Sequence, residues 1–175
     1  MSISRPDLSV ERGTSLSVEA CGGVPAVSAA AIQPAIADVG RKLDILVAED
    51  NPMIRTLISK LLKKRGHMAD TVVNGEEAVA AVQRKAYDLV LMDMQMPKMG
   101  GVSATMTIRK LSGPERLVPI VALTGDALVG QRESCLAAGM DDYLCKPFEP
   151  ADFYAVIDRR AAVKAGSEVA HGDDL

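Results

Sequence analysis

The sequence contains no tryptophan, and its three tyrosines and two phenylalanines make up only 3% of 175 residues. Because hydrophobic residues still account for 48%, a folded core must be built mainly from aliphatic side chains and methionine. Cysteine is also scarce: Cys21, Cys135 and Cys145 are odd in number and share no paired spacing. This argues against a disulfide framework and favours a reducing, cytoplasmic location.

Positive charge and long apolar runs are lacking as well. The formal net charge is −3 and the isoelectric point is about 5.4, so the chain has no basic field with which to hold nucleic acid. No apolar run approaches the roughly 18 residues that a membrane span needs, and the first residues lack the pattern of a signal peptide. We expect a cytoplasmic protein that binds neither nucleic acid nor membrane.

The ends of the chain differ from its middle. Residues 1–41 have no aromatic side chain, and Ser, Ala, Gly and Pro interrupt each short apolar stretch. Such a segment buries too little apolar surface to offset the entropy lost on ordering, so we expect a flexible linker or tail. Residues 165–175 are similarly polar and are predicted to be a disordered tail. Residues 42–164 are predicted to form one domain.

The middle of the chain alternates between strand and helix patterns. Short apolar runs predict strands at 43–48, 67–73, 88–93, 119–124 and 142–146. Helical spacing predicts helices at 52–66, 74–86, 100–111, 126–139 and 149–164. Apolar strands separated by helices indicate a parallel sheet covered on both faces. Right-handed crossovers leave few arrangements, and the simplest is a doubly wound α/β fold with five parallel strands in the order 2-1-3-4-5.

Acidic and basic residues stand at the ends of these strands. Glu49 and Asp50 follow the first strand, and Asp93 ends the third. The predicted order makes these two strands neighbours at the point where strand order reverses, which is where ligands bind in such sheets. Thr124 ends the fourth strand and Lys146 the fifth. We therefore expect three carboxylates, a hydroxyl and one cation in a single crevice.

Converging carboxylates repel one another unless a cation lies among them. Oxygen ligands suit Mg²⁺ or Mn²⁺ rather than zinc, and neither His67 nor His171 is placed to bind a metal there. With the cation present, Asp93 remains available as a nucleophile toward phosphorus, while Lys146 and Thr124 hold the oxygens of the transferred group. The expected product is an aspartyl phosphate.

Each of these residues has a simpler explanation when it is taken alone. Asp93 would begin a loop, and Thr124 would cap the following helix. Glu49 and Asp50 would favour a helix N-terminus, and Lys146 would be an ordinary solvated lysine. Their coincidence at the ends of four strands favours the functional interpretation.

The motifs "AEDN", "LMDMQMP", "ALT" and "CKPF" occur in this order at the strand ends. With them, the chain resembles the receiver domain of two-component response regulators over about residues 42–164. It is most similar to receivers that belong to, or work with, hybrid histidine kinases. The resemblance implies the flavodoxin-like receiver fold and a phosphoacceptor domain of a phosphorelay, which takes a phosphoryl group from phosphohistidine in a Mg²⁺-dependent reaction.

The resemblance also implies a role for each matching residue. Asp93 is the phosphoacceptor, and Lys146 pairs with the phosphoryl group. Asp50 and Asp93 bind Mg²⁺ directly, and Glu49 binds it through a water. The backbone carbonyl of Gln95 completes the protein ligands.

Signal output is implied in the same way. Thr124 binds a phosphoryl oxygen, and Tyr143 is the aromatic partner of Thr124 in a switch. Phosphorylation would then change the surface formed by the fourth helix, the fifth strand and the fifth helix, and with it partner binding or homodimer formation.

The resemblance implies that the phosphoryl donor is a histidine kinase or a His-containing phosphotransfer protein. The domain is not an enzyme beyond catalysing its own phosphorylation and dephosphorylation. One departure is Gly100, where the family usually has an Asp that caps the third helix, so a weaker cap is expected.

Three rival functions fit less well. An enzyme of the haloacid dehalogenase type needs a second Asp as general acid where this chain has Gln95. A flavin carrier needs a Ser/Thr/Gly-rich phosphate loop where Glu49 and Asp50 stand, and two acids would repel the flavin phosphate. A DNA-binding regulator needs a further helical domain, but only about eleven residues follow Lys164.

Overall fold

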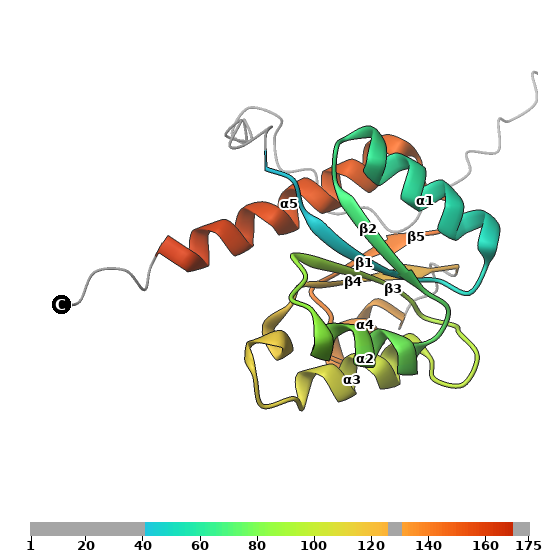
Figure 1. The fold of residues 1–175 in the computed structure, drawn as a ribbon. Helices are drawn as coiled ribbons and strands as arrows, with labels where there is room; N and C mark the ends of the chain where they lie inside the picture. Colours follow the sequence, from blue (N-terminus) through green and yellow to red (C-terminus); the bar gives the residue numbers. More distant parts are fainter. Residues whose placement is uncertain (1–40, 126–130, 170–175) are drawn as a thin grey trace, which may run out of the picture. The chain divides into compact units, whose positions relative to one another are not determined.

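The computed structural model describes residues 41–125 and 131–169. Within them lies a five-stranded sheet with the strand order β2-β1-β3-β4-β5 (Figure 1). All neighbouring strands pair in parallel. This confirms the predicted doubly wound fold and its strand order. The strands are β1 (Asp44–Ala48), β2 (Met68–Val72), β3 (Leu89–Asp93), β4 (Ile120–Thr124) and β5 (Asp142–Cys145).

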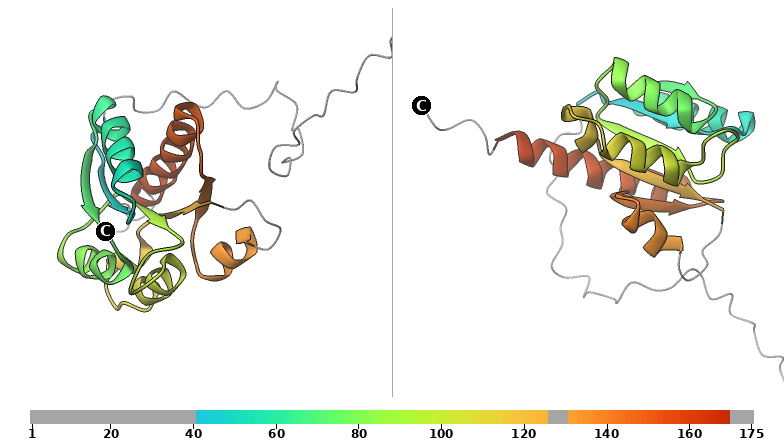
Figure 2. Two further views of the ribbon diagram at one scale, coloured as in Figure 1. Left: turned by 90° about the vertical axis from the view of Figure 1, so that its right-hand side faces the viewer. Right: turned by 90° about the horizontal axis from the view of Figure 1, so that it is seen from below.

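Helices cover both faces of the sheet. Helices α1 and α5 pack on one face, and α2, α3 and α4 pack on the other (Figure 1 and Figure 2). None of the helices in the described ranges is long and apolar enough to cross a membrane. The helices are α1 (Pro52–Lys64), α2 (Gly75–Arg84), α3 (Gly101–Arg109), α4 (Gln131–Ala137) and α5 (Pro150–Val169), with a short 3-10 helix, η1 (Pro114–Leu117), before β4.

The core lies in two layers, one on each face of the central strands. Alternate residues of a strand point to opposite faces. Ile45 and Val47 of β1 therefore pack with the apolar residues of α1 and α5, whereas Leu46 and Ala48 pack with those of α2 and α3. Most of this core is aliphatic, as the composition predicts, with Phe153 as its largest fully buried side chain. Strands β3 and β4 are buried along their whole length, while the edge strand β2 is largely exposed.

Capping residues place the helix starts close to the strand ends. The side chain of Asn51 accepts a hydrogen bond from the N–H of Met53 at 2.9 Å, so α1 begins directly after the acidic pair that follows β1. Asn74 and Glu77 cap α2 in the same way, with the Glu77 N–H donating to Asn74 Oδ1 at 2.9 Å. Gly100 is the N-cap of α3 and supplies no side-chain hydrogen bond, which is the weaker cap expected there.

The structure differs from the predicted boundaries at the C-terminal end. Helix α5 continues to Val169, so residues 165–169 are helical rather than part of a disordered tail. The alanine-rich stretch 161–165 favours this continuation, because alanine has the highest helix propensity. The first part of the predicted fourth helix, residues 1–40 of the linker predicted over 1–41, and residues 170–175 lie outside the described ranges, and their assignments stay predictions.

Candidate functional site

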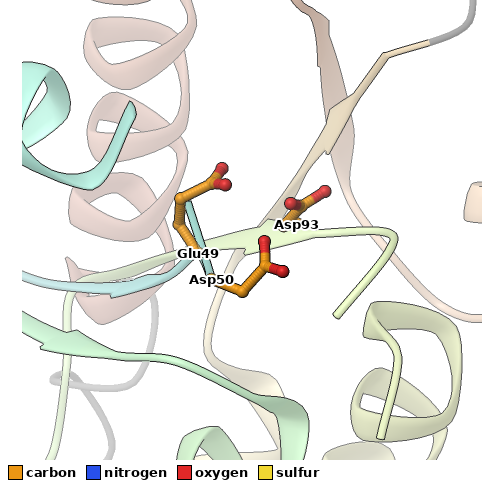
Figure 3. A group of neighbouring side chains, drawn as sticks. All are labelled: Glu49, Asp50 and Asp93. Atoms are coloured by element: carbon orange, nitrogen blue, oxygen red, sulfur yellow. The ribbon is translucent and has the colours of Figure 1, made fainter. Parts of the chain in front are cut away.

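The acidic residues meet because β1 and β3 are neighbours. The register pairs Ala48 with Met92, so the residues that follow each of them emerge at the same edge of the sheet. Figure 3 shows Glu49 and Asp50 at the end of β1 facing Asp93 at the end of β3. Each of the three residues offers a carboxylate oxygen, and these oxygens lie within 4.8 Å of one another. The predicted convergence of three carboxylates is therefore present.

A cleft of about 430 Å³ opens at this edge of the sheet. It contains every side chain that the strand-end argument selected, from four different strands. Its lining residues are Glu49, Asp50, Asn51, Ile54, Asp93, Met94, Gln95, Thr124, Gly125 and Lys146.

Lys146 connects two of the three carboxylates. Its ammonium nitrogen Nζ lies 2.9 Å from Asp93 Oδ2 and 3.0 Å from Glu49 Oε2. The backbone N–H of Lys146 also donates to the carbonyl of Thr124 at 2.6 Å, which ties the end of β5 to the end of β4. The peptide bond between Lys146 and Pro147 is cis. The lysine thus offsets part of the negative charge that gathers in the cleft.

The two adjacent acids that follow β1 have different surroundings. Glu49 is fully buried, whereas Asp50 is exposed at the mouth of the cleft. Burial raises the pKa of Glu49, the hydrogen bond from Lys146 opposes that rise, and the negative charge of Asp93 adds to it. Burial acts to lower the pKa of Lys146, but its hydrogen bonds with Asp93 and Glu49 outweigh this and leave that pKa raised. The arrangement keeps Lys146 charged.

Asp93 is held at the start of a tight loop. The residue is buried, and Oδ1 accepts a hydrogen bond from the backbone N–H of Gln95 at 3.2 Å. The N–H of Gly101 donates to the carbonyl of Met94 at 3.1 Å and closes the loop against α3. A Cβ atom at Gly101 would collide with the carbonyl oxygen of Asp93, so only glycine allows this approach.

Thr124 and Tyr143 share one face of the sheet. Ala122 of β4 pairs with Tyr143 of β5, and Thr124 lies two residues beyond Ala122, so all three side chains point to the same side. Thr124 is buried at the cleft, and the half-buried ring of Tyr143 packs against the core on the α2–α3–α4 face. A row of side chains therefore leads from the cleft toward β5.

The structure also adds Arg55 of α1, which the sequence interpretation missed. One guanidinium nitrogen, Nη1, donates to the backbone carbonyl of Glu49 at 2.8 Å and to that of Asp50 at 3.1 Å. A signal was present in the sequence, because a cation close to a helix N-terminus opposes the helix dipole and needs another reason to be there. The capping Asn51 was likewise not singled out.

The fold and the cleft define an acidic site, of a kind that could hold a metal ion, at the switch point of a doubly wound sheet. Comparison with known proteins names the class: residues 45–158 match the model of the response regulator receiver domain. The chain belongs to this family, as the motifs predicted.

The relatives include receivers of sensor kinases. The chain is 43% identical over 121 residues to hybrid signal transduction histidine kinase G of Dictyostelium discoideum, covering 68% of this chain and 4% of that protein. It is 41% identical over 128 residues to sensor protein GacS of Pseudomonas syringae pv. syringae, covering 69% of this chain and 14% of that protein. The chain thus spans a small part of the length of these relatives.

A solved structure shows the same fold. The receiver domain of sensor histidine kinase PA1611 from Pseudomonas aeruginosa is 43% identical, with a TM-score of 0.65, and the match covers 70% of this chain and 99% of that one. That crystal structure has a magnesium ion coordinated in its active site cleft.

Proposed function

We propose that this chain is the phosphoacceptor domain of a two-component phosphorelay and that Asp93 is the residue phosphorylated. The observation that carries the proposal is the cleft itself. There, the Asp93 carboxylate lies beside the ammonium of Lys146 and within 4.8 Å of the carboxylates of Glu49 and Asp50.

The donor set fits a hard divalent cation. Carboxylate and carbonyl oxygens with room for water suit Mg²⁺ or Mn²⁺, and no histidine or cysteine is among the described residues that line the cleft. Asp50 and Asp93 would bind the ion directly, Glu49 would bind it through a water, and Gln95 would contribute its backbone carbonyl. When bound, the ion offsets the charge of the carboxylates and of the incoming phosphoryl group. The magnesium ion in the related receiver from Pseudomonas aeruginosa supports this choice.

Asp93 acts as the nucleophile in this proposal. One of its oxygens attacks the phosphorus of a phosphohistidine, a bond between that oxygen and phosphorus forms, and the bond from phosphorus to the imidazole nitrogen breaks. The imidazole leaves with the electron pair of that bond. Lys146 and Thr124 hold the oxygens of the phosphoryl group during the transfer. The domain catalyses this step and the later hydrolysis of its own aspartyl phosphate, and it turns over no other substrate.

The partner that donates the phosphoryl group is a histidine kinase or a His-containing phosphotransfer protein. The relationship to receivers of hybrid histidine kinases supports this partner class. Such a relay would operate in the cytoplasm.

Output is proposed to begin at Thr124. Phosphorylation of Asp93 adds up to about two negative charges and strong acceptor oxygens. Thr124 moves toward them, and Tyr143, on the same face of the sheet, turns further inward. The resulting change at the surface of α4, β5 and α5 alters partner binding or homodimer formation.

Intact-mass measurement after incubation with Mg²⁺ and a small acyl phosphate tests the acceptor. The wild-type chain is expected to gain the mass of one phosphoryl group, and Asp93→Asn is expected to gain none. Asp152→Asn, which changes an exposed aspartate of α5, is the matched control and should label like the wild type. Equal labelling of Asp93→Asn and the wild type would refute the assignment.

A further inference from the structure

We infer that Arg55 is a positioning residue for the metal-binding carboxylates. Its guanidinium bonds the backbone carbonyls of both Glu49 and Asp50, at 2.8 and 3.1 Å, and touches neither carboxylate at hydrogen-bond distance in the described part of the chain. The inference rests on the proposed function, because it assigns Arg55 a role in presenting that site's ligands.

Arg55 is itself held in place by the first turns of α1. Its N–H donates to the carbonyl of Asn51 at 2.9 Å, and its own carbonyl accepts from Ser59 Oγ at 2.8 Å. The side chain therefore starts from a fixed helical position and reaches back to the two residues that precede the helix. This contact ties the turn between β1 and α1 to the helix that follows it.

The contact completes the hydrogen bonding of the peptide groups around Glu49. The N–H of Glu49 donates to the carbonyl of Val72 on β2 at 3.1 Å, and its C=O accepts from Arg55. The N–H of Asn51 donates to Glu49 Oε1 at 3.2 Å. Because both the N–H and the C=O of Glu49 are hydrogen-bonded, the backbone there is fixed and directs the Glu49 side chain into the cleft. The same fixed turn sets the direction of the Asp50 side chain.

Charge alone does not explain this placement. A cation near the first turn of a helix is unfavourable to the helix dipole, and it repels a divalent ion at the carboxylates. Positioning and charge therefore predict opposite outcomes when the guanidinium is removed. Loss of repulsion would tighten Mg²⁺ binding, whereas loss of the two charge-assisted hydrogen bonds would weaken it. We expect weakening, because water and salt screen the repulsion of a partly exposed guanidinium.

The experiment compares Arg55→Met, Arg55→Lys and the control Lys60→Met, which removes an exposed charge from the same helix. Mg²⁺ affinity is measured by NMR titration of the full chain. Arg55→Met is expected to raise the Mg²⁺ Kd by roughly five- to twentyfold, in line with the worth of charge-assisted hydrogen bonds. Lys60→Met should leave it unchanged. Arg55→Lys keeps the charge but replaces the rigid, planar guanidinium that carries Nη1 with an ammonium on a flexible stem, and it should also weaken binding.

Amide hydrogen exchange without metal gives an independent readout. Arg55→Met should speed exchange at Glu49 and Asn51 while leaving the amides of β3 protected as in the wild type. Unchanged or tighter Mg²⁺ binding by both Arg55 variants, with unchanged exchange, would overturn the inference. Should Arg55→Met not fold, Arg55→Lys alone decides by the same two measurements. Failure of the wild type to bind Mg²⁺ would instead refute the proposed function, and the exchange measurement would still test the role of Arg55 in the turn.

Discussion

Lys146 Nζ lies 2.9 Å from Asp93 Oδ2, and the same nitrogen lies 3.0 Å from Glu49 Oε2. Both carboxylates are almost fully buried, with exposed side-chain fractions of 7% for Asp93 and 1% for Glu49. Lys146 adds a charged partner to the backbone N–H that each of them accepts from, Gln95 for Asp93 and Asn51 for Glu49. The ammonium thus lies between two carboxylates of the proposed site and offsets their charge. The proposed phosphoacceptor Asp93 and Lys146 are therefore an ion pair.

Replacing Lys146 should therefore separate metal binding from phosphorylation. Lys146→Met removes the ammonium that competes for Glu49 and Asp93, so Mg²⁺ affinity should rise severalfold. The labelling rate should fall at least about tenfold, because the cation that holds the phosphoryl group is lost. Lys110→Met, which changes an exposed lysine at the end of α3, should alter neither quantity. A labelling rate equal to that of the wild type would contradict the role given to Lys146.

The close approach at Gly101 is expected to be intolerant of a side chain. Gly101→Ala places a Cβ against the carbonyl oxygen of Asp93, and the loop must shift to relieve the collision. We expect a loss of about 1–3 kcal/mol in the free energy of unfolding, together with slower labelling. The matched variant is Gly125→Ala, where a Cβ meets nothing within 4 Å and stability should change by less than about 1 kcal/mol. Urea unfolding measures the stability of both variants. Equal losses for Gly101→Ala and Gly125→Ala would show that the close contact between residue 101 and the carbonyl of Asp93 is unimportant.

His67 should make stability fall in mildly acidic solution. Its Nδ1 accepts a hydrogen bond from the N–H of Leu43 at 3.4 Å, and its buried Nε2 has no partner among the described residues. Burial lowers the pKa of His67 below its ordinary value of 6.5; the nearby charge of Asp158 opposes this shift, and that of Arg65 adds to it. As the pH falls, the unfolded chain binds the proton first. The stability contribution is therefore complete above pH 6.5 and is lost as the pH drops toward the folded-state pKa.

Unfolding by urea on either side of pH 6.5 measures this dependence. As the pH falls, the unfolding free energy of the wild type should decrease more than that of His67→Gln. A difference that stays constant across this range would contradict the prediction.

Residues 1–40 should be dispensable for the chemistry. Every proposed site residue lies beyond position 48, and a chain that begins at Arg41 keeps the ion pair between Arg41 and Asp88 at 3.1 Å. Labelling rate and unfolding free energy should equal those of the full chain. A large loss of either would show that the removed segment contributes to the folded domain.

Local pattern was enough to predict the elements and the acidic residues. An apolar run that stops at a carboxylate marks the end of a strand, as at Asp93. Because the connections between parallel strands are right-handed, one simple strand order then remains. That order brings Asp93 next to Glu49 and Asp50 without any knowledge of side-chain contacts. The motifs added the family, and the match over residues 45–158 confirmed it.

Only the tertiary structure decided which of these acidic residues is buried and which is exposed. Glu49 and Asp50 are neighbours in sequence, yet one is buried against Lys146 and the other is exposed, because only the packing of β1 between its neighbours determines which side chain turns inward. Arg55 reaches back to the acidic turn through a long side chain with many rotamers, and no local pattern selects among them. The sequence by itself determined which groups gather at the sheet edge, since that depends on local periodicity and crossover handedness. The folded chain alone decided which of them share a hydrogen bond, since that depends on distances between segments far apart in the sequence.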